Sequence, residues 1–320
     1  IRVEQAATSG LKAITGVSTD QGDIACEYLV NCAGMWAREV GKMVGVSIPL
    51  YAAEHMHMTT NPVEGTYKGM PYLRDMDGYI YVKEEMGGLL LGGFEPVAKP
   101  WGMHKPGGQG GIPEDFSFGE IPPDWDRMMP HLELAMKRIP IVKDVGVHKF
   151  FCGPESFTPD MGPLMGEAPE LKNFYVAAGF NSLGILFGGG VGQIMAQWIV
   201  DGLPPVDVSD INIARMMPFQ NNPKYLHDRT VELLGWQYSS WPNLQAETAR
   251  NVRRSAMHDR LAAAGAYFGQ SVGWEYPDWF APDGTEPEVE YSWGRQNWFE
   301  YAAEEHRAAR EDVCLLYTSP

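Results

Sequence analysis

Two histidines in one short segment carry the clearest acid–base chemistry in the sequence. His55 and His57 lie in AAEHMHMTT, which has the composition of a strand. Side chains two residues apart on a strand point to the same side of the sheet. Imidazole changes charge near neutral pH, so either residue could take a proton from a substrate. A strand histidine can equally be a hydrogen-bonded structural residue, so this pattern alone nominates a pair without choosing between them.

Two tyrosines with the same spacing follow in DGYIYVKEE. Tyr79 and Tyr81 should share one face of a strand, and Lys83 should share it with them. A phenol there could hydrogen-bond an amine, a carboxylate or an imidazole, although strands also use aromatic residues as cross-strand pairs. Lys83 could hold a substrate carboxylate, but a lysine at the end of a strand is typically exposed.

A site of a different kind is predicted for YVAAGFNSLGI, residues 175–185, which contains no acid, base or strong nucleophile. A buried run ends at Gly179, and a long apolar helix starts near Gly184. Glycines at a helix start let a flat ligand approach backbone N–H groups that favour negative charge. The alternative is a tight packing turn. NCAGMWA repeats the pattern with Gly34 and Trp36, although a tryptophan on a first helical turn is commonly a core residue.

The composition narrows the class of partner. The chain has 320 residues and a formal net charge of -16. Nucleic acid and anionic lipid both require clustered Lys and Arg, so neither is an expected partner, and no run approaches the roughly 20 apolar residues of a membrane span. No cluster has metal-ligand spacing, and the proximity of His148 and Cys152 is interpreted as coincidence. The cysteines are scattered without a CxxC pair, which fits a reducing compartment: Cys26, Cys32, Cys152 and Cys314.

The elements that must position these residues form an interrupted pattern. Short strands with glycine-containing turns lead to a strand at 28–32 and a helix, and then to strands between 48 and 94 with one covered face. A loop rich in Gly and Pro precedes a helix at 126–138. The chain then returns to the strand–turn–helix segment, whose helix should stop at Gly202. GGGVGQ, 188–193, lies inside this helix, so close helix packing is favoured over a phosphate loop.

The predicted fold class is therefore α/β (α+β), with a cofactor domain interrupted by an antiparallel substrate sheet and followed by a mixed α/β module. The expected divisions are 1–47, 48–150, 151–203, 204–313 and a tail at 314–320. The last module is rich in tryptophan, and core and interdomain packing is favoured over a nucleic-acid stacking platform because the chain is acidic. The tryptophans concerned are Trp236, Trp241, Trp274, Trp279, Trp293 and Trp298.

Successive blocks of the chain resemble one family. They are VNCAGMWAREVG, IPLYAAEH, MPYLRDMDGYIYVKEEMGGLLLGGFEP, FFCGPESFTPDMGPLMGEAPEL and FYVAAGFNSLGI. In these blocks the chain is similar to the dimethylglycine and sarcosine dehydrogenases, which are FAD enzymes of the D-amino-acid-oxidase-like superfamily. Later segments resemble the central module that joins the flavin half to a folate-binding half similar to the glycine-cleavage T protein: YLHDRTVELLG, GWEYPDWFAP and RQNWFEYAAEEHRAARE.

The resemblance implies oxidative demethylation of dimethylglycine or sarcosine by hydride transfer to N5 of FAD. It favours His55 over His57 and Tyr81 over Tyr79 as catalytic residues, because these match the family's active-site positions. Hydride loss requires a neutral amine, which gives His55 the task of removing a proton and Tyr81 that of hydrogen bonding. The positions implied to contact the flavin are Gly34, Trp36, Gly153, Gly179, Phe180, Asn181, Ser182, Leu183 and Gly184.

Some family features are not found in these residues. GxGxxG, the family's pyrophosphate-binding loop, is absent, and the sequence starts inside a strand-like run without Met. We therefore expect a fragment with an incomplete FAD site that is inactive alone, ending in a foreign or truncated tail at 314–320. Tetrahydrofolate in the other half and an electron-transferring flavoprotein are partners that only the resemblance implies. It also implies the bacterial cytoplasm or the mitochondrial matrix.

Two other functions stay open at this point. The regulatory subunit of pyruvate dehydrogenase phosphatase shares blocks such as CGPESFTPDM, and there the fold would be a non-catalytic scaffold. An amine oxidase that passes electrons to oxygen is the second. Retention of His55 and Tyr81 favours catalysis. GPESFTPDMGP is predicted to be a framework loop in which Glu155 could touch cofactor or substrate.

Overall fold

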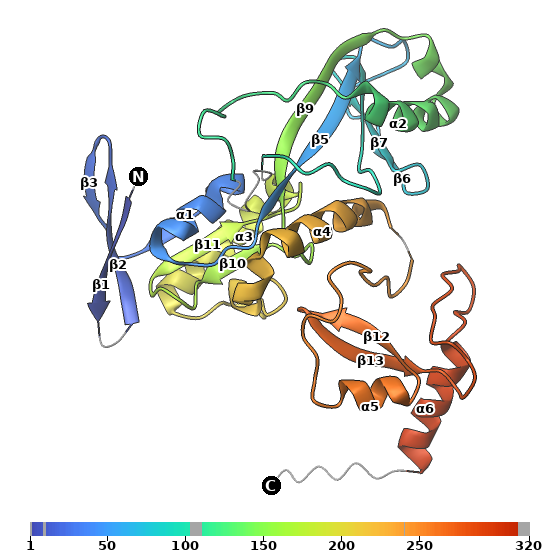
Figure 1. Ribbon diagram of the computed structural model, residues 1–320. Coiled ribbons are helices and arrows are strands. Elements are labelled where there is room, and N and C mark those ends of the chain that lie inside the picture. The colour runs from blue at the N-terminus through green and yellow to red at the C-terminus, as the bar shows by residue number, and fades with distance from the viewer. Residues whose placement is uncertain (1, 9–10, 103–110, 240, 313–320) are drawn as a thin grey trace. The chain divides into compact units, whose positions relative to one another are not determined.

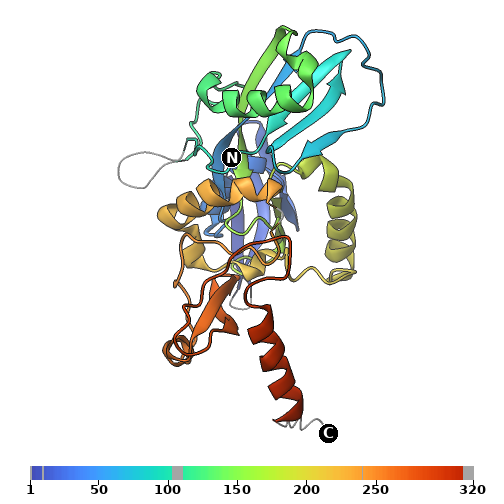
Figure 2. The ribbon, with the colours of Figure 1, turned by 90° about the vertical axis from the view of Figure 1, so that its right-hand side faces the viewer.

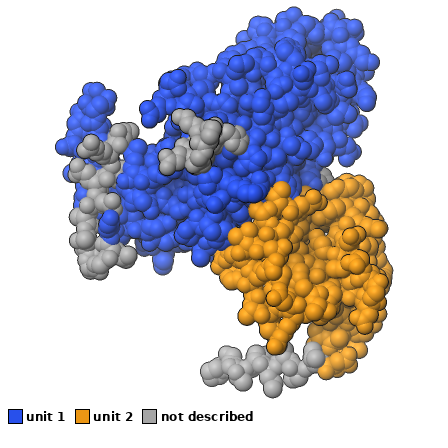
Figure 3. Space-filling model, in the orientation of Figure 1, with its two compact units in different colours: residues 1–239 blue, residues 240–320 orange. Residues whose placement is uncertain are grey.

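The computed structural model describes residues 2–8, 11–102, 111–239 and 241–312. The predicted tail at 314–320 lies outside these residues. The chain divides into two compact units, 1–239 and 240–320 (Figure 3), and the predicted boundary at 204 falls inside the first. Among the helices that the structure describes, none combines the length and the hydrophobicity needed to cross a bilayer.

A three-stranded sheet carries the strand–turn–helix segment of unit 1. Its strands are β4 (Leu29–Asn31), β11 (Phe174–Ala178) and β10 (Leu164–Glu167), in the order β10-β11-β4. β4 runs parallel to β11, which is buried along its whole length, as is usual for a central strand covered on both faces. Because the paired strands β4 and β11 come from distant parts of the chain, the predicted interrupted domain is confirmed.

Each of these two parallel strands is followed by a helix. β4 leads into η1 (Gly34–Trp36) and α1 (Ala37–Val44), and β11 leads into α3 (Gly184–Asp201). α3 ends at Gly202, which adopts a left-handed backbone with φ 77°, as predicted. It packs on the sheet through Met195 and Trp198 in its C-terminal half. In the described residues nothing lies within 4 Å of a Cβ placed on the glycines of 188–192, so the expected close packing there is wrong.

The predicted N-terminal meander is also present. β1 (Arg2–Thr8), β2 (Leu11–Thr19) and β3 (Gly22–Ala25) form an antiparallel sheet in that order. The turn between β2 and β3 contains Asp20 and Gln21, within the DQGD segment that indicated it. An isolated bridge between Ala13 and Lys172 joins β2 to the segment that precedes β11.

The inserted sheet has five antiparallel strands in the order β6-β7-β8-β5-β9. Their bounds are β6 (Leu73–Asp75), β7 (Ile80–Glu85), β8 (Gly88–Gly93), β5 (Tyr51–Thr60) and β9 (Val147–Phe157). β5 and β9 run side by side over their whole lengths (Figure 1), from Tyr51 opposite Phe157 to Thr60 opposite Val147. β9 therefore crosses the predicted boundary at 150.

The two faces of this sheet have different surroundings. α2 (Trp125–Arg138), followed by η2 (Pro140–Lys143), lies across one face (Figure 2) and packs against side chains such as Met56, Met58 and Leu91. The side chains of β5 alternate, so His55 and His57 point to the other face. The hydrophobic face fixes the strand register, and that register places both imidazoles on one surface.

Short helices complete unit 1, and a small α/β arrangement forms unit 2. Unit 1 ends with η3 (Ile213–Arg215), η4 (Pro218–Asn221), α4 (Pro223–Leu233) and η5 (Leu234–Tyr238). Unit 2 contains α5 (His258–Ala263), the antiparallel pair β12 (Ala266–Ser271) and β13 (Trp274–Phe280), and α6 (Phe299–Glu311). Trp279 is only 2% exposed and stacks with Tyr267 and Tyr301, which confirms a core role for that tryptophan.

Candidate active site

A cavity of about 720 Å³ in unit 1 brings together most of the residues nominated from the sequence. Its volume is in the range of small-molecule sites. The nominated residues that line it are Gly34, Trp36, His55, Gly153, Gly179, Phe180, Asn181, Ser182 and Gly184. Leu183, the remaining predicted cofactor residue, is the N-cap of α3 and does not line the cavity. Tyr81 does not line it either, but its hydroxyl contacts a residue that does.

That contact joins the two predicted catalytic residues. Nε2 of His55 lies 3.3 Å from the hydroxyl of Tyr81, and the His55 ring stacks on Phe94 with 4.4 Å between ring centroids. The hydrogen-bond roles of the two atoms depend on which nitrogen of the imidazole is protonated. The pair is therefore a buried polar contact held by aromatic packing.

Two glycines lie beside this contact, on the two strands that flank β5. On β8, Gly92 pairs with Tyr81, and a Cβ at Gly92 would occupy the space of the Tyr81 ring. The ring can therefore lean across β8 towards β5. On β9, Gly153 pairs directly with His55, and both residues line the cavity. A Cβ is excluded at Gly92 by the Tyr81 ring and at Gly153 by the Phe151 ring, which would lie 2.9 Å from it.

Burial controls the charge of these groups. Desolvation lowers the pKa of His55, and the charge of Glu155 acts in the opposite direction. Desolvation likewise raises the pKa of the Tyr81 phenol, and the charge of Glu155 adds to that effect. The site therefore holds a neutral imidazole beside a neutral phenol at physiological pH.

The alternatives left open by the sequence lie elsewhere or make different contacts. His57 also lines the cavity, but it stacks on Phe151, and burial lowers its pKa. Tyr79 precedes β7 with a left-handed backbone, φ 53°, so strand alternation does not reach it, and it lines a separate cavity. Lys83 pairs with Glu85 at 2.7 Å and is about half exposed, which confirms the expectation of a surface lysine.

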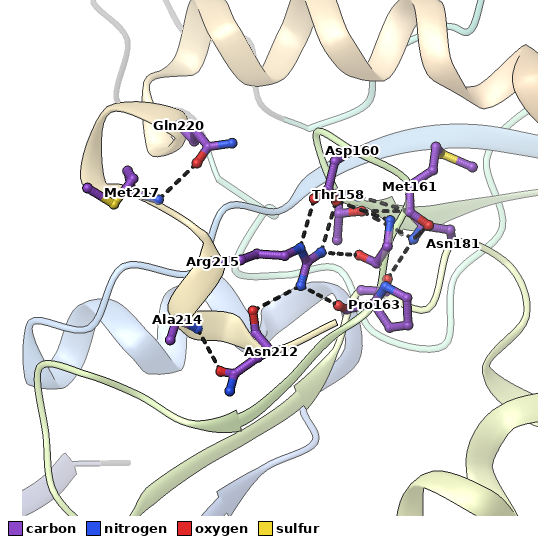
Figure 4. A network of polar contacts seen from close by, with 12 residues as sticks. Thr158, Asp160, Met161, Pro163, Asn181, Asn212, Ala214, Arg215, Met217 and Gln220 are labelled. Carbon is purple, nitrogen blue, oxygen red and sulfur yellow. Dashed lines mark hydrogen bonds and ion pairs between the residues drawn. The ribbon is translucent and has the colours of Figure 1, made fainter. Parts of the chain in front are cut away.

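The turn between β11 and α3 is held in place by Asn181. Its Oδ1 accepts from the backbone N–H of Thr158 at 2.9 Å, and its Nδ2 donates to the carbonyls of Met161 and Gly179 (Figure 4). Asn181 and Ser182 both have positive φ, at 49° and 71°. Because the Asn181 side chain is used internally and is 3% exposed, what this turn presents to the cavity is mainly backbone.

A second clamp fixes the loop that follows β9. Arg215 of η3 forms two parallel bonds to Asp160, at 2.8 and 2.9 Å, and donates to the carbonyls of Gly162 and Pro163 (Figure 4). The arginine side chain is only 5% exposed, so this is a well-defined bidentate pair. The segment after α3 thus helps to fix the loop that holds Thr158 against Asn181.

The start of α3 fits the flavin ring that the resemblance implies. Gly184 and Ile185 of its first turn line the cavity, no side chain caps the helix, and no acidic residue stands in that turn. The first N–H groups of an α-helix have no partner inside the helix and carry its positive end. Gly34, which lines the same cavity, has φ 57° and open space where a side chain would stand. For a flat ligand, these residues leave open space and provide backbone N–H donors and a positive electrostatic potential.

Several cavity residues were not identified from the sequence. Phe116, Ser117, Phe118 and Gly119 come from the loop rich in Gly and Pro, where no periodicity marks a face. The one signal in the sequence was the close spacing of two phenylalanines, Phe116 and Phe118. Glu155, which the sequence suggested could touch cofactor or substrate, does line the cavity, and it lies on β9 opposite Ala53 of β5.

Metal and thiol chemistry find no support in the described part of the chain. No group of three His, Cys, Asp or Glu side chains there is placed to hold a metal ion. Burial raises the pKa of the Cys152 thiol to about 11 and also raises that of Cys32. Thiolates are therefore disfavoured at both positions.

Comparison with protein families gives three consecutive matches. The FAD dependent oxidoreductase family matches residues 2–198, the FAD dependent oxidoreductase central domain matches 201–255, and the GCVT N-terminal domain matches 257–319. The first match covers both parts of the interrupted domain and the inserted sheet. All the residues that line the cavity lie within it.

Curated proteins and solved structures agree with this assignment. The chain is 43% identical over 308 residues to the 4-methylaminobutanoate oxidase (formaldehyde-forming) of Paenarthrobacter nicotinovorans, covering 96% of this chain and 36% of that protein. It is 38% identical to the mitochondrial sarcosine dehydrogenase of Homo sapiens, covering 89% of this chain and 30% of that protein. It thus spans about a third of their lengths. The L-proline dehydrogenase of P. horikoshii shares the fold, with a TM-score of 0.51 and 24% identity over 63% of this chain and 50% of that one.

Proposed function

This chain belongs to the FAD dependent oxidoreductase family, and on that premise we propose that it forms the substrate side of an enzyme that oxidatively demethylates an N-methyl amino acid. The observation that carries the proposal is the contact between His55 and Tyr81 at a cavity that also receives the start of α3. The two relatives described above are named for N-methyl amino acids, which supports the same class of substrate. Dimethylglycine, sarcosine and 4-methylaminobutanoate are the candidates.

Bound FAD would supply the two-electron acceptor for oxidation of a C–H bond next to nitrogen. The residues that would hold its ring are the backbone of 179–184 and Gly34, with Trp36 at the cavity wall. Asn181 positions this backbone through its internal hydrogen bonds. The fit depends on shape and N–H donors rather than on a charged side chain.

The part of the chemistry assigned to His55 is removal of a proton. A secondary or tertiary amine is protonated in water, and the C–H bond is activated only when the nitrogen lone pair is free. A neutral His55 can accept the ammonium proton, because its buried ring is held in the uncharged form. Tyr81 fixes the orientation of the imidazole through its hydroxyl and remains a neutral phenol.

Partners outside these residues are proposed on the same basis. The match to the GCVT N-terminal domain at 257–319 is compatible with tetrahydrofolate as acceptor of the released one-carbon unit. An electron-transferring flavoprotein and molecular oxygen are alternative electron acceptors. Oxygen consumption during amine oxidation would identify the second, and its absence under turnover with an artificial acceptor would favour the first.

The test is anaerobic reduction of the full-length flavoprotein by each of the three candidate amines. We expect at least one to bleach the visible flavin band, and we expect His55→Gln to slow bleaching by about 10²- to 10⁴-fold, the usual contribution of a general base. Tyr81→Phe should slow it less, by about 10-fold, because the imidazole remains. His148→Gln, an exposed histidine on β9, is the matched control and should behave as wild type.

Two outcomes of this experiment would contradict the proposed demethylation. A preparation that retains its flavin but is reduced by none of the N-methyl amines would reject the proposed reaction and favour the scaffold alternative. Equal loss in the His55 and His148 variants would show that the effect is general and does not arise from the active site.

A further inference from the structure

The cavity has one acidic wall residue. Among its described lining residues Glu155 carries the only formal charge, and no Lys or Arg is present. Oε2 of Glu155 is fully buried and has no hydrogen-bond partner in the described residues. Burying a carboxylate oxygen without a partner is unfavourable, so such an atom is typical of a position that a ligand completes.

The strand register puts this carboxylate on the same face of the sheet as His55. Glu155 and His55 lie on adjacent strands and on the same face, because Glu155 pairs with Ala53 and His55 with Gly153. Gly153, two residues before Glu155 on the same face, carries no side chain, and the Phe151 ring lies against it. The charge of Glu155 also acts on the pKa values of both His55 and Tyr81, as expected for groups that share one cavity.

The cations around the inserted sheet pair with carboxylates other than Glu155. Arg127 lies behind the sheet, where it donates to Glu54 at 2.6 Å and also pairs with Glu95. Lys99 is paired with Glu54 and Asp124. Lys83 and Lys149, whose charges act on His57, pair with Glu85 and Glu120. None of the ion pairs among the described residues therefore engages Glu155.

We propose that Glu155 binds the ammonium form of the substrate and that the site prefers N-methyl amino acids whose carboxylate is separated from the amine by several methylene groups. This inference rests on the proposed function and adds a specificity residue to it. A cationic nitrogen beside Glu155 gains a charge-assisted hydrogen bond. A carboxylate on the adjacent carbon, as in sarcosine or dimethylglycine, would be brought towards Glu155 and repelled, whereas a more distant carboxylate would not.

The experiment compares three amines in the full-length enzyme: sarcosine, 4-methylaminobutanoate and N-methylbutylamine, which has no carboxylate. We expect wild type to have a higher kcat/KM for the two long amines than for sarcosine. Glu155→Gln should raise KM for the long amines by about 10- to 100-fold, the value of a charge-assisted hydrogen bond, with a smaller change in kcat. It should affect sarcosine less, because the repulsion is lost together with the attraction.

Two further variants separate substrate binding from a structural role. Glu155→Asp keeps the charge and should recover part of the KM effect. Glu114→Gln removes an exposed carboxylate from the segment that leads into the cavity loop, and it should leave all three substrates unchanged.

The inference is overturned if Glu155→Gln leaves KM unchanged for every amine, or if it lowers kcat equally for all three while KM stays fixed. It is also overturned if wild type has a higher kcat/KM for sarcosine than for the two long amines, or if Glu155→Gln impairs sarcosine as much as it impairs them. These outcomes differ from failure of the proposed function, in which the wild-type flavin is reduced by none of the three amines.

Discussion

Asn181→Ala tests whether the turn before α3 depends on one side chain. The substitution removes the acceptor for the buried N–H of Thr158 and the donors to the carbonyls of Met161 and Gly179. An unsatisfied buried N–H costs about 1–3 kcal/mol, and each lost bond to a carbonyl costs about 0.5–1.5 kcal/mol. Alanine at φ 49° adds about 1 kcal/mol, because asparagine tolerates the left-handed region better. The expected loss of unfolding free energy is therefore about 3–7 kcal/mol.

The matched control is Asn173→Ala. Asn173 also has a left-handed backbone, φ 64°, but in the described residues its side chain forms no hydrogen bond that would be lost. It should cost only the backbone contribution of about 1 kcal/mol. Urea unfolding of the full-length protein, followed by circular dichroism and by flavin fluorescence on release, measures both. Equal midpoints for the two variants, or a loss below about 1 kcal/mol for Asn181→Ala, would refute the reasoning.

Two other predictions concern the histidine face of the inserted sheet. Gly92→Ala places a methyl group in the space of the Tyr81 ring, so we expect flavin reduction by the amine to slow by about 10-fold while flavin is retained; an unchanged rate would contradict the role assigned to the glycine. Burial lowers the pKa values of His55, His57 and His131, so the unfolded state binds more protons below about pH 6.5, and the unfolding free energy should fall as pH decreases from 7 to 5. Urea midpoints across that range test this, and a midpoint that rises on acidification would contradict it.

The sequence predicted the structure best where side chains alternate along a strand or where a glycine marks a turn or a helix end. Alternation in AAEHMHMTT predicted that His55 and His57 share a face, and the structure places both at the cavity. Glycine punctuation located the turn at 179–184 and the end of α3 at Gly202. The predicted fold class and the family resemblance are confirmed by the interrupted sheet and by the family matches.

Long-range register was beyond the reach of such patterns. The contact between His55 and Tyr81 depends on Gly92 standing between them on β8, and strand order cannot be deduced from local composition. The prediction that Tyr79 shares a strand face with Tyr81 is wrong, because the backbone at Tyr79 is left-handed and the residue precedes the strand. The loop at 116–119 has no period, and the unpartnered oxygen of Glu155 becomes visible only when its neighbours are known. The roles of these residues stay predictions until the variants are measured.

The ladder between β5 and β9 has a further consequence for how the protein folds. Its partners lie on the order of a hundred residues apart in the chain, since Tyr51 pairs with Phe157 and Thr60 with Val147. Contacts with such sequence separation form slowly, because the intervening chain must be ordered first. During synthesis, His55 meets Gly153 only after the whole inserted sheet and α2 have left the ribosome. The face of the sheet that carries His55 and His57 should therefore form late in folding. Until β5 and β9 pair, each leaves an unpaired strand edge that can aggregate or bind chaperones.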